Sequence, residues 1–134
     1  FSQSGARAQR PTSTRSRLIG GPLPEYPDRV ARANPITYID SDDPPFLFIH
    51  GTADLTVPFS QSQLMHDALK AQGVSSCLVR VINAGHTFRG LFMRPSRTQI
   101  NQMVAAFFDR HLRGTNAPSD PGAILLDQYC SEPA

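Results

Sequence analysis

The sequence predicts an α/β fold with a parallel pair of strands and flanking helices, and three segments carry this prediction. Residues 46–50 form a largely apolar run that ends at Gly51, which is typical of a strand buried in a parallel sheet. A helical pattern follows at about 61–72, and a second apolar, β-branched run follows at 77–82. Strand, helix and strand in this order are expected of a parallel α/β unit.

Residues 1–34 precede this unit and are predicted to form an irregular arm or connecting loop. They contain six arginines, together with several Ser, Thr, Pro and Gly, and show no regular apolar period. The basic stretch 7–17 is interpreted as a solvated connecting loop, with a basic binding arm as the alternative. A short helix is expected at 28–33, ahead of Pro35.

The helix between the two strands has both a start and a stop signal. The sequence Ser60–Gln63 predicts a capping box at its N-terminus. Leu64, Ala68 and Leu69 are spaced to share one helical face, and Gly73 stands where a left-handed residue would end the helix.

A last helix is indicated after the second strand, and Gly114 is expected to close it. Residues 35–114 are therefore predicted to form the α/β subdomain. Residues 115–134, which are rich in Pro, Ser, Asp and Gly, are predicted to form a tail. The apolar residues that define the last helix are Ile100, Met103, Val104, Phe107, Phe108 and Leu112.

Composition excludes several classes of function. A chain of 134 residues suits one small domain, and a formal net charge of +2 is too weak to indicate nucleic acid or an anionic membrane as the main partner. No apolar run approaches the ~20 residues that span a bilayer. Cys77 and Cys130 allow at most one internal disulfide and lack the spacing of a metal site. No metal and no cofactor are expected. Cys77 is expected to lie in the core, and the cellular compartment is left open.

Two loops carry candidate catalytic residues. Asp54 follows the end of the first predicted strand by four residues, and His86 follows the end of the second by four. Because the carboxyl ends of parallel strands meet at one edge of a sheet, both side chains are expected to reach the same rim. A carboxylate and an imidazole placed in this way are the two supporting members of a nucleophilic triad.

These segments together resemble the C-terminal part of an α/β-hydrolase, in the esterase/lipase and prolyl-oligopeptidase-like branch. The resemblance covers about residues 17–113 and extends upstream to segments similar to bacterial carboxylesterases of the feruloyl or acetylxylan type. It implies half of a hydrolase sheet with flanking helices, incomplete as a domain. The matching segments are Leu18–Gly21, Asn34–Tyr38, Pro44–Asp54, Val57-Pro58, Ala68-Leu69, Gly73-Val74 and Ala84–His86.

The resemblance implies that Asp54 is the triad acid and His86 the base, in the chain order nucleophile, acid, histidine. No Gly-x-Ser-x-Gly occurs in the 134 residues, so the nucleophile and the oxyanion hole are expected outside this chain, which alone is predicted to be inactive. The expected partner is the N-terminal half of the hydrolase, on the same polypeptide or as a second chain. An uncovered strand edge also predicts self-association of the isolated chain.

Other aromatic and imidazole side chains are weighed against this pair. His50 is expected to be a hydrogen-bonded neighbour of the site and not the base, because Gly51 follows it directly. Phe88 is a candidate for an acyl or leaving-group pocket, with core or lid packing as the open alternative. His66 and His111 lie in predicted helices and are expected to be solvated.

The resemblance implies a serine hydrolase that acts on small carboxylic esters without a cofactor. Two alternatives stay open from the sequence. A serine peptidase of the prolyl-oligopeptidase type would share nearly all of these motifs. A non-catalytic α/β module would instead use the basic arm or the open sheet edge to bind a partner.

Overall fold

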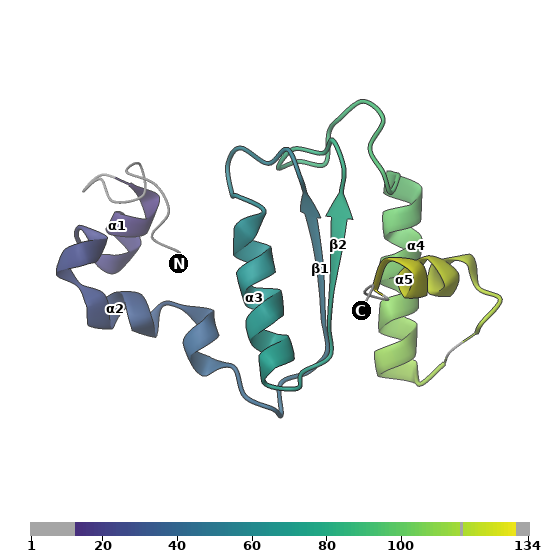
Figure 1. Cartoon of the computed structure of the whole chain (residues 1–134), viewed down its shortest axis with the longest axis horizontal. Helices are drawn as coiled ribbons and strands as arrows, with labels where there is room; N and C mark the ends of the chain where they lie inside the picture. Colours follow the sequence, from purple (N-terminus) through teal and green to yellow (C-terminus); the bar gives the residue numbers. More distant parts are fainter. Residues whose placement is uncertain (1–12, 116, 131–134) are drawn as a thin grey trace. The chain divides into compact units, whose positions relative to one another are not determined.

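The computed structural model describes residues 13–115 and 117–130, which form two compact units, one within Phe1–Asp40 and one within Ser41–Ala134. The second unit holds the predicted parallel strand pair. β1 (Phe46–Gly51) and β2 (Ser76–Val81) lie parallel, with Phe46 opposite Ser76 and Gly51 opposite Val81 (Figure 1). The α/β fold class predicted from the sequence is confirmed, and the second strand begins one residue earlier than expected.

Helix α3 (Ser60–Ala71) connects the two strands. Its C-terminus is the one predicted, because Gly73 adopts a φ of 79° and its N–H, with that of Val74, bonds the last carbonyls of the helix. The predicted capping box is wrong. The helix begins one residue after Phe59, which makes no side-chain cap, and the turn is started by the backbone carbonyls of Pro58 and Phe59.

One face of β2 forms the core of this unit. Cys77, Val79 and Val81 are buried there and pack with residues of two helices, α4 (Arg97–Phe108) and α5 (Pro121–Cys130). Helix α4 starts with a complete capping box from Ser96 and Gln99. It continues as a π-helical turn, Asp109–Arg113, that ends at Gly114, where φ is 64°.

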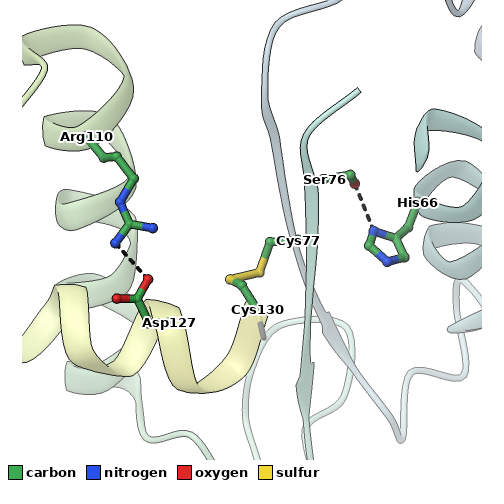
Figure 2. Close-up of a disulfide and its surroundings, with 6 residues drawn as sticks. All are labelled: His66, Ser76, Cys77, Arg110, Asp127 and Cys130. Atoms are coloured by element: carbon green, nitrogen blue, oxygen red, sulfur yellow. Dashed lines mark hydrogen bonds and ion pairs between the residues drawn. A yellow bond between two sulfur atoms is a disulfide. The ribbon is translucent and has the colours of Figure 1, made fainter. Parts of the chain in front are cut away.

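Residues 115–134 are not simply a tail, because they contain α5. The helix buries Ala123 and Leu126 against the core, and Arg110 bonds Asp127 at 2.8 Å. A disulfide joins Cys77 in β2 to Cys130 at the end of α5, with a Cα–Cα distance of 5.0 Å (Figure 2). By closing the loop of chain between Cys77 and Cys130, the disulfide stabilises the fold by about 4 kcal/mol in the chain-entropy model. The expectation that Cys77 lies in the core is confirmed.

The first unit, within Phe1–Asp40, contains more helix than the irregular arm predicted for residues 1–34. It contains α1 (Thr14–Ile19) and α2 (Pro27–Arg32), and α2 matches the short helix expected at 28–33. Helix α1 forms because Ser13 accepts the N–H of Ser16 and Gly20 ends the helix with a φ of 89°. Two 3₁₀ turns complete the unit, Leu23–Glu25 and Pro35–Tyr38. Residues 7–12 of the basic stretch lie outside the described residues.

Within the part of the chain that the structure describes, no helix is long and apolar enough to cross a bilayer.

Candidate active site

The loops that follow β1 and β2 are joined through their backbones. The N–H of Thr52 donates to Val81 at 3.0 Å, and the N–H of Ala53 donates to Ala84 at 3.0 Å. Gly51 makes this approach possible, since a Cβ at that position would collide with the carbonyl of Ala84. The two loops therefore extend from the carboxyl edge of the sheet as a bonded pair.

Asp54 lies at the centre of this loop pair. Its Oδ1 accepts the N–H groups of Thr56 and Val57, both at 2.8 Å, and its Oδ2 lies 2.9 Å from Nδ1 of His86. The Asp54 side chain is only 4% exposed. The structure thus brings Asp54 and His86 together at the distance expected from the sequence, and Asp54 also holds its own loop.

Its surroundings keep Asp54 ionised. Burial of the carboxyl group raises its pKa, but hydrogen bonds from the Val57 amide, the His86 ring and the Thr56 amide outweigh burial and lower the pKa from 3.8 to about 2. An ionised carboxylate only accepts hydrogen bonds, so Nδ1 of His86 carries the proton between them. The other ring nitrogen, Nε2, is then unprotonated in the neutral ring and can accept a proton.

His86 is placed by a tight loop after β2. Asn83 and Phe88 adopt positive φ values of 60° and 52°, which turn the chain sharply on both sides of the histidine. Ala84, two residues earlier, is fully buried and anchors the loop in the core. The His86 side chain itself is 53% exposed. The loop therefore presents a partly solvated imidazole whose Nδ1 faces Asp54.

His50, the last side chain of β1, also lies next to Asp54. Its Nε2 is 3.0 Å from the carbonyl of Val57 and 3.3 Å from Oδ2 of Asp54, and its Nδ1 is 2.6 Å from Oγ of Ser62. The structure places His50 next to the acid, as a hydrogen-bonded neighbour. Ser62, in the first turn of α3, gave no signal in the sequence because its approach to His50 depends on the path of the intervening loop.

The remaining aromatic and imidazole candidates lie elsewhere. Phe88 is half-buried against the core cluster, and its carbonyl accepts a bond from Arg97 at 2.9 Å, so its contacts are those of the packing alternative. A role for Phe88 in a pocket stays a prediction. The expectation that His66 is solvated is wrong: it is 4% exposed, with Nδ1 2.8 Å from Oγ of Ser76 (Figure 2). His111 is exposed, as expected, and its ring lies near that of Phe107.

A cavity of about 600 Å³ opens away from the Asp54–His86 pair. It is lined by residues of α3, β2 and α5, among them His66, Arg80 and Tyr129. Neither Asp54 nor His86 lines it, so it is not the space in which this pair would meet a substrate. Among residues 13–115 and 117–130, no group of three or more His, Cys, Asp or Glu side chains is arranged to hold a metal ion.

Residues 1–69, just over half of the chain, match the model of a family described as BD-FAE. Among curated proteins, the chain is 36% identical over 65 residues to esterase LipQ of Mycobacterium tuberculosis, which covers 48% of this chain and 15% of LipQ. It is 30% identical over 79 residues to a Bacillus subtilis protein named uncharacterized peptidase YuxL, which covers 59% of this chain and 12% of YuxL. The chain therefore spans less than a sixth of the length of either relative.

Two solved structures show the same kind of partial match. Bifunctional GH43-CE from Bacteroides eggerthii superposes with a TM-score of 0.62 and 37% identity, covering 75% of this chain and 13% of that chain. Native esterase 2 of the planctomycete Thermogutta terrifontis superposes with a TM-score of 0.52 and 32% identity, covering 66% of this chain and 32% of that chain.

Proposed function

Because the chain belongs to the BD-FAE family, we propose that it supplies the catalytic acid and the general base of a serine hydrolase that cleaves carboxylic esters. The relationship to esterases with an α/β-hydrolase fold is shown by the family model, by LipQ and by the Thermogutta esterase, and it confirms the resemblance found in the sequence. The roles of Asp54 and His86 are the proposal. One observation carries it: the 2.9 Å contact between a buried carboxylate and a half-exposed imidazole at the carboxyl edge of parallel strands.

In the proposed reaction, His86 passes on one proton in each of two half-reactions. Its Nε2 takes the proton of a serine hydroxyl while the serine oxygen attacks the ester carbonyl, and Asp54 stabilises the imidazolium that forms. The tetrahedral intermediate collapses when Nε2 donates this proton to the oxygen of the departing alcohol. Water then attacks the acyl-enzyme by the same route, releasing the acid and restoring the serine.

The nucleophile and the oxyanion donors of the proposed enzyme lie outside these 134 residues. The chain holds no Gly-x-Ser-x-Gly, which is the motif that exposes the serine in this fold. Without a nucleophile, the loops that carry Asp54 and His86 cannot form an acyl-enzyme. We therefore expect the 134-residue chain to be inactive by itself, with the N-terminal half of a hydrolase domain as its partner and a small ester as the substrate.

The test uses the protein that joins this chain to a Gly-x-Ser-x-Gly half. His86→Ala should lower kcat for p-nitrophenyl acetate by about 10³-fold or more, because the serine loses its base, while KM changes much less. Labelling by paraoxon, which phosphorylates Thermogutta terrifontis esterase 2, should slow in the same variant. His111→Ala is the control, since this exposed histidine lies far along the chain from the acid loop.

A variant with His86→Ala that kept full turnover would overturn the proposed role and favour a non-catalytic module. The similarity to YuxL keeps a second candidate, a serine peptidase with the same acid and base. The ratio of kcat/KM for a peptide amide and for an ester with the same acyl group separates these two enzymes. An esterase should cleave the ester with almost no cleavage of the amide, whereas a peptidase should cleave both.

A further inference from the structure

His50 is a buried side chain that the proposed proton transfer does not use. It is 9% exposed at the end of β1. Its ring and the ring of Phe59 pack edge to face, with ring centroids 5.6 Å apart. Both of its nitrogens have polar partners: Nδ1 meets Ser62, and Nε2 meets both Val57 and Asp54. A buried imidazole with every polar atom engaged has a defined orientation.

The partners of His50 also define its tautomer. Nε2 lies between the carbonyl of Val57 at 3.0 Å and the carboxylate of Asp54 at 3.3 Å. Both groups only accept hydrogen bonds, so Nε2 must carry a proton. In the neutral ring Nδ1 is then an acceptor, and the hydroxyl of Ser62, 2.6 Å away, donates to it. The Ser62 hydroxyl therefore favours the ring form that has a proton on the Asp54 side.

The same carboxylate oxygen receives both histidines. Oδ1 of Asp54 is held by two backbone amides, whereas Oδ2 lies 2.9 Å from His86 and 3.3 Å from His50. With the side chain 4% exposed, water has little access to replace a missing donor. His50 thus places a second ring nitrogen 3.3 Å from Oδ2, the atom toward which Nδ1 of His86 must point, while its own hydrogen bond goes to the Val57 carbonyl.

We propose, on the basis of the proposed function, that His50 and Ser62 are positioning residues for the esterase reaction. Ser62 orients His50, His50 fixes Oδ2 of Asp54, and Oδ2 fixes the ring of His86 so that Nε2 faces the nucleophile. The arrangement packs the ring of His50 against Oδ2 of Asp54, with the ring held by Ser62 and by the Val57 carbonyl. Neither residue touches the reacting atoms.

The kinetic test is Ser62→Ala in the protein that carries the nucleophile half. Loss of one neutral hydrogen bond should lower kcat by about 3- to 10-fold with KM nearly unchanged. Ser62→Thr keeps a hydroxyl and should stay close to wild type. Ser60→Ala is the matched control, because it makes the same change at an exposed position of the same helical turn.

A second measurement reads the geometry without turnover. In protein with ¹⁵N-labelled histidines, NMR should report His50 with its proton on Nε2 and His86 with its proton on Nδ1. Ser62→Ala should broaden or shift the Nδ1–H signal of His86, and His50→Leu should do so more strongly. His50→Gln, whose amide can donate near the position of Nε2, should preserve more of that signal than His50→Leu.

Two results would overturn the positioning role: equal kcat for Ser62→Ala and Ser60→Ala, or His50 with its proton on Nδ1. The failure of the proposed function would look different. It would appear as full turnover in His86→Ala, while the tautomers of His50 and His86 and their response to Ser62→Ala would still decide how the two residues are arranged.

Discussion

The loops that carry Asp54 and His86 follow neighbouring strands, but they hold these two side chains in opposite ways. Asp54 is 4% exposed and has both oxygens bonded to donors, whereas His86 is 53% exposed and turns one nitrogen toward the acid. Asp54 is fixed by its own loop. His86 takes its orientation from Asp54 and keeps its other nitrogen accessible, as the proposed proton transfer requires.

Asp54→Asn removes the fixed partner and has the largest expected effect. The amide of Asn has only one acceptor oxygen for the donors that surround Asp54. If its NH₂ group takes the place of Oδ2, Nδ1 of His86 loses its acceptor, and the ring no longer holds the required tautomer. In the protein with the nucleophile half, kcat should fall by about 10³- to 10⁴-fold. Asp67→Asn, at an exposed position of α3, is the control and should retain near-normal kcat.

Gly51→Ala separates the two loops without changing Asp54 or His86. A Cβ at Gly51 would collide with the Ala84 carbonyl, so the loops must move apart, at a cost of about 1 to 3 kcal/mol in unfolding free energy. Gly85→Ala is the comparison, because its Cβ would find its nearest neighbours at 3.9 Å. Urea denaturation should show a clear loss for Gly51→Ala only, and equal losses would contradict the role given to Gly51.

A further expected effect is the pH dependence of stability contributed by Asp54. Its pKa is 3.8 ordinarily and about 2 in the folded chain, so folding is favoured while the carboxylate is ionised. This contribution is fully present above about pH 4 and is lost as the pH falls through about 2. The gap in unfolding free energy between wild type and Asp54→Asn should therefore narrow over this range. A gap that stays constant would mean that Asp54 is not stabilised as an anion.

The features predicted from the sequence are those that local pattern determines. The strands, α3 and the left-handed Gly73 follow from apolar periodicity and turn chemistry within a few residues. The contact between Asp54 and His86 joins distant residues, but parallel strands bring their carboxyl ends to one edge, so topology alone placed both loops together.

The features that the sequence did not predict depend on the path of the chain between elements. Helix α5 lies in a segment whose Pro and Gly content indicated a tail, and its burial depends on the face offered by α4 and on the bond from Cys130 to Cys77. His66 was expected in water because no pattern shows that Ser76 would meet it. Such contacts need the folded arrangement before they can be identified.

The backbone bonds from Thr52 to the end of β2 and from Ala53 to the loop of His86 limit how such a site can be altered, by evolution or by design. An insertion in either loop would shift the other, because the two share a ladder of amides and carbonyls. New substrate preferences are thus easier to build on segments outside this ladder. The acid and base loops would be inherited together as one unit, with their lengths changing little.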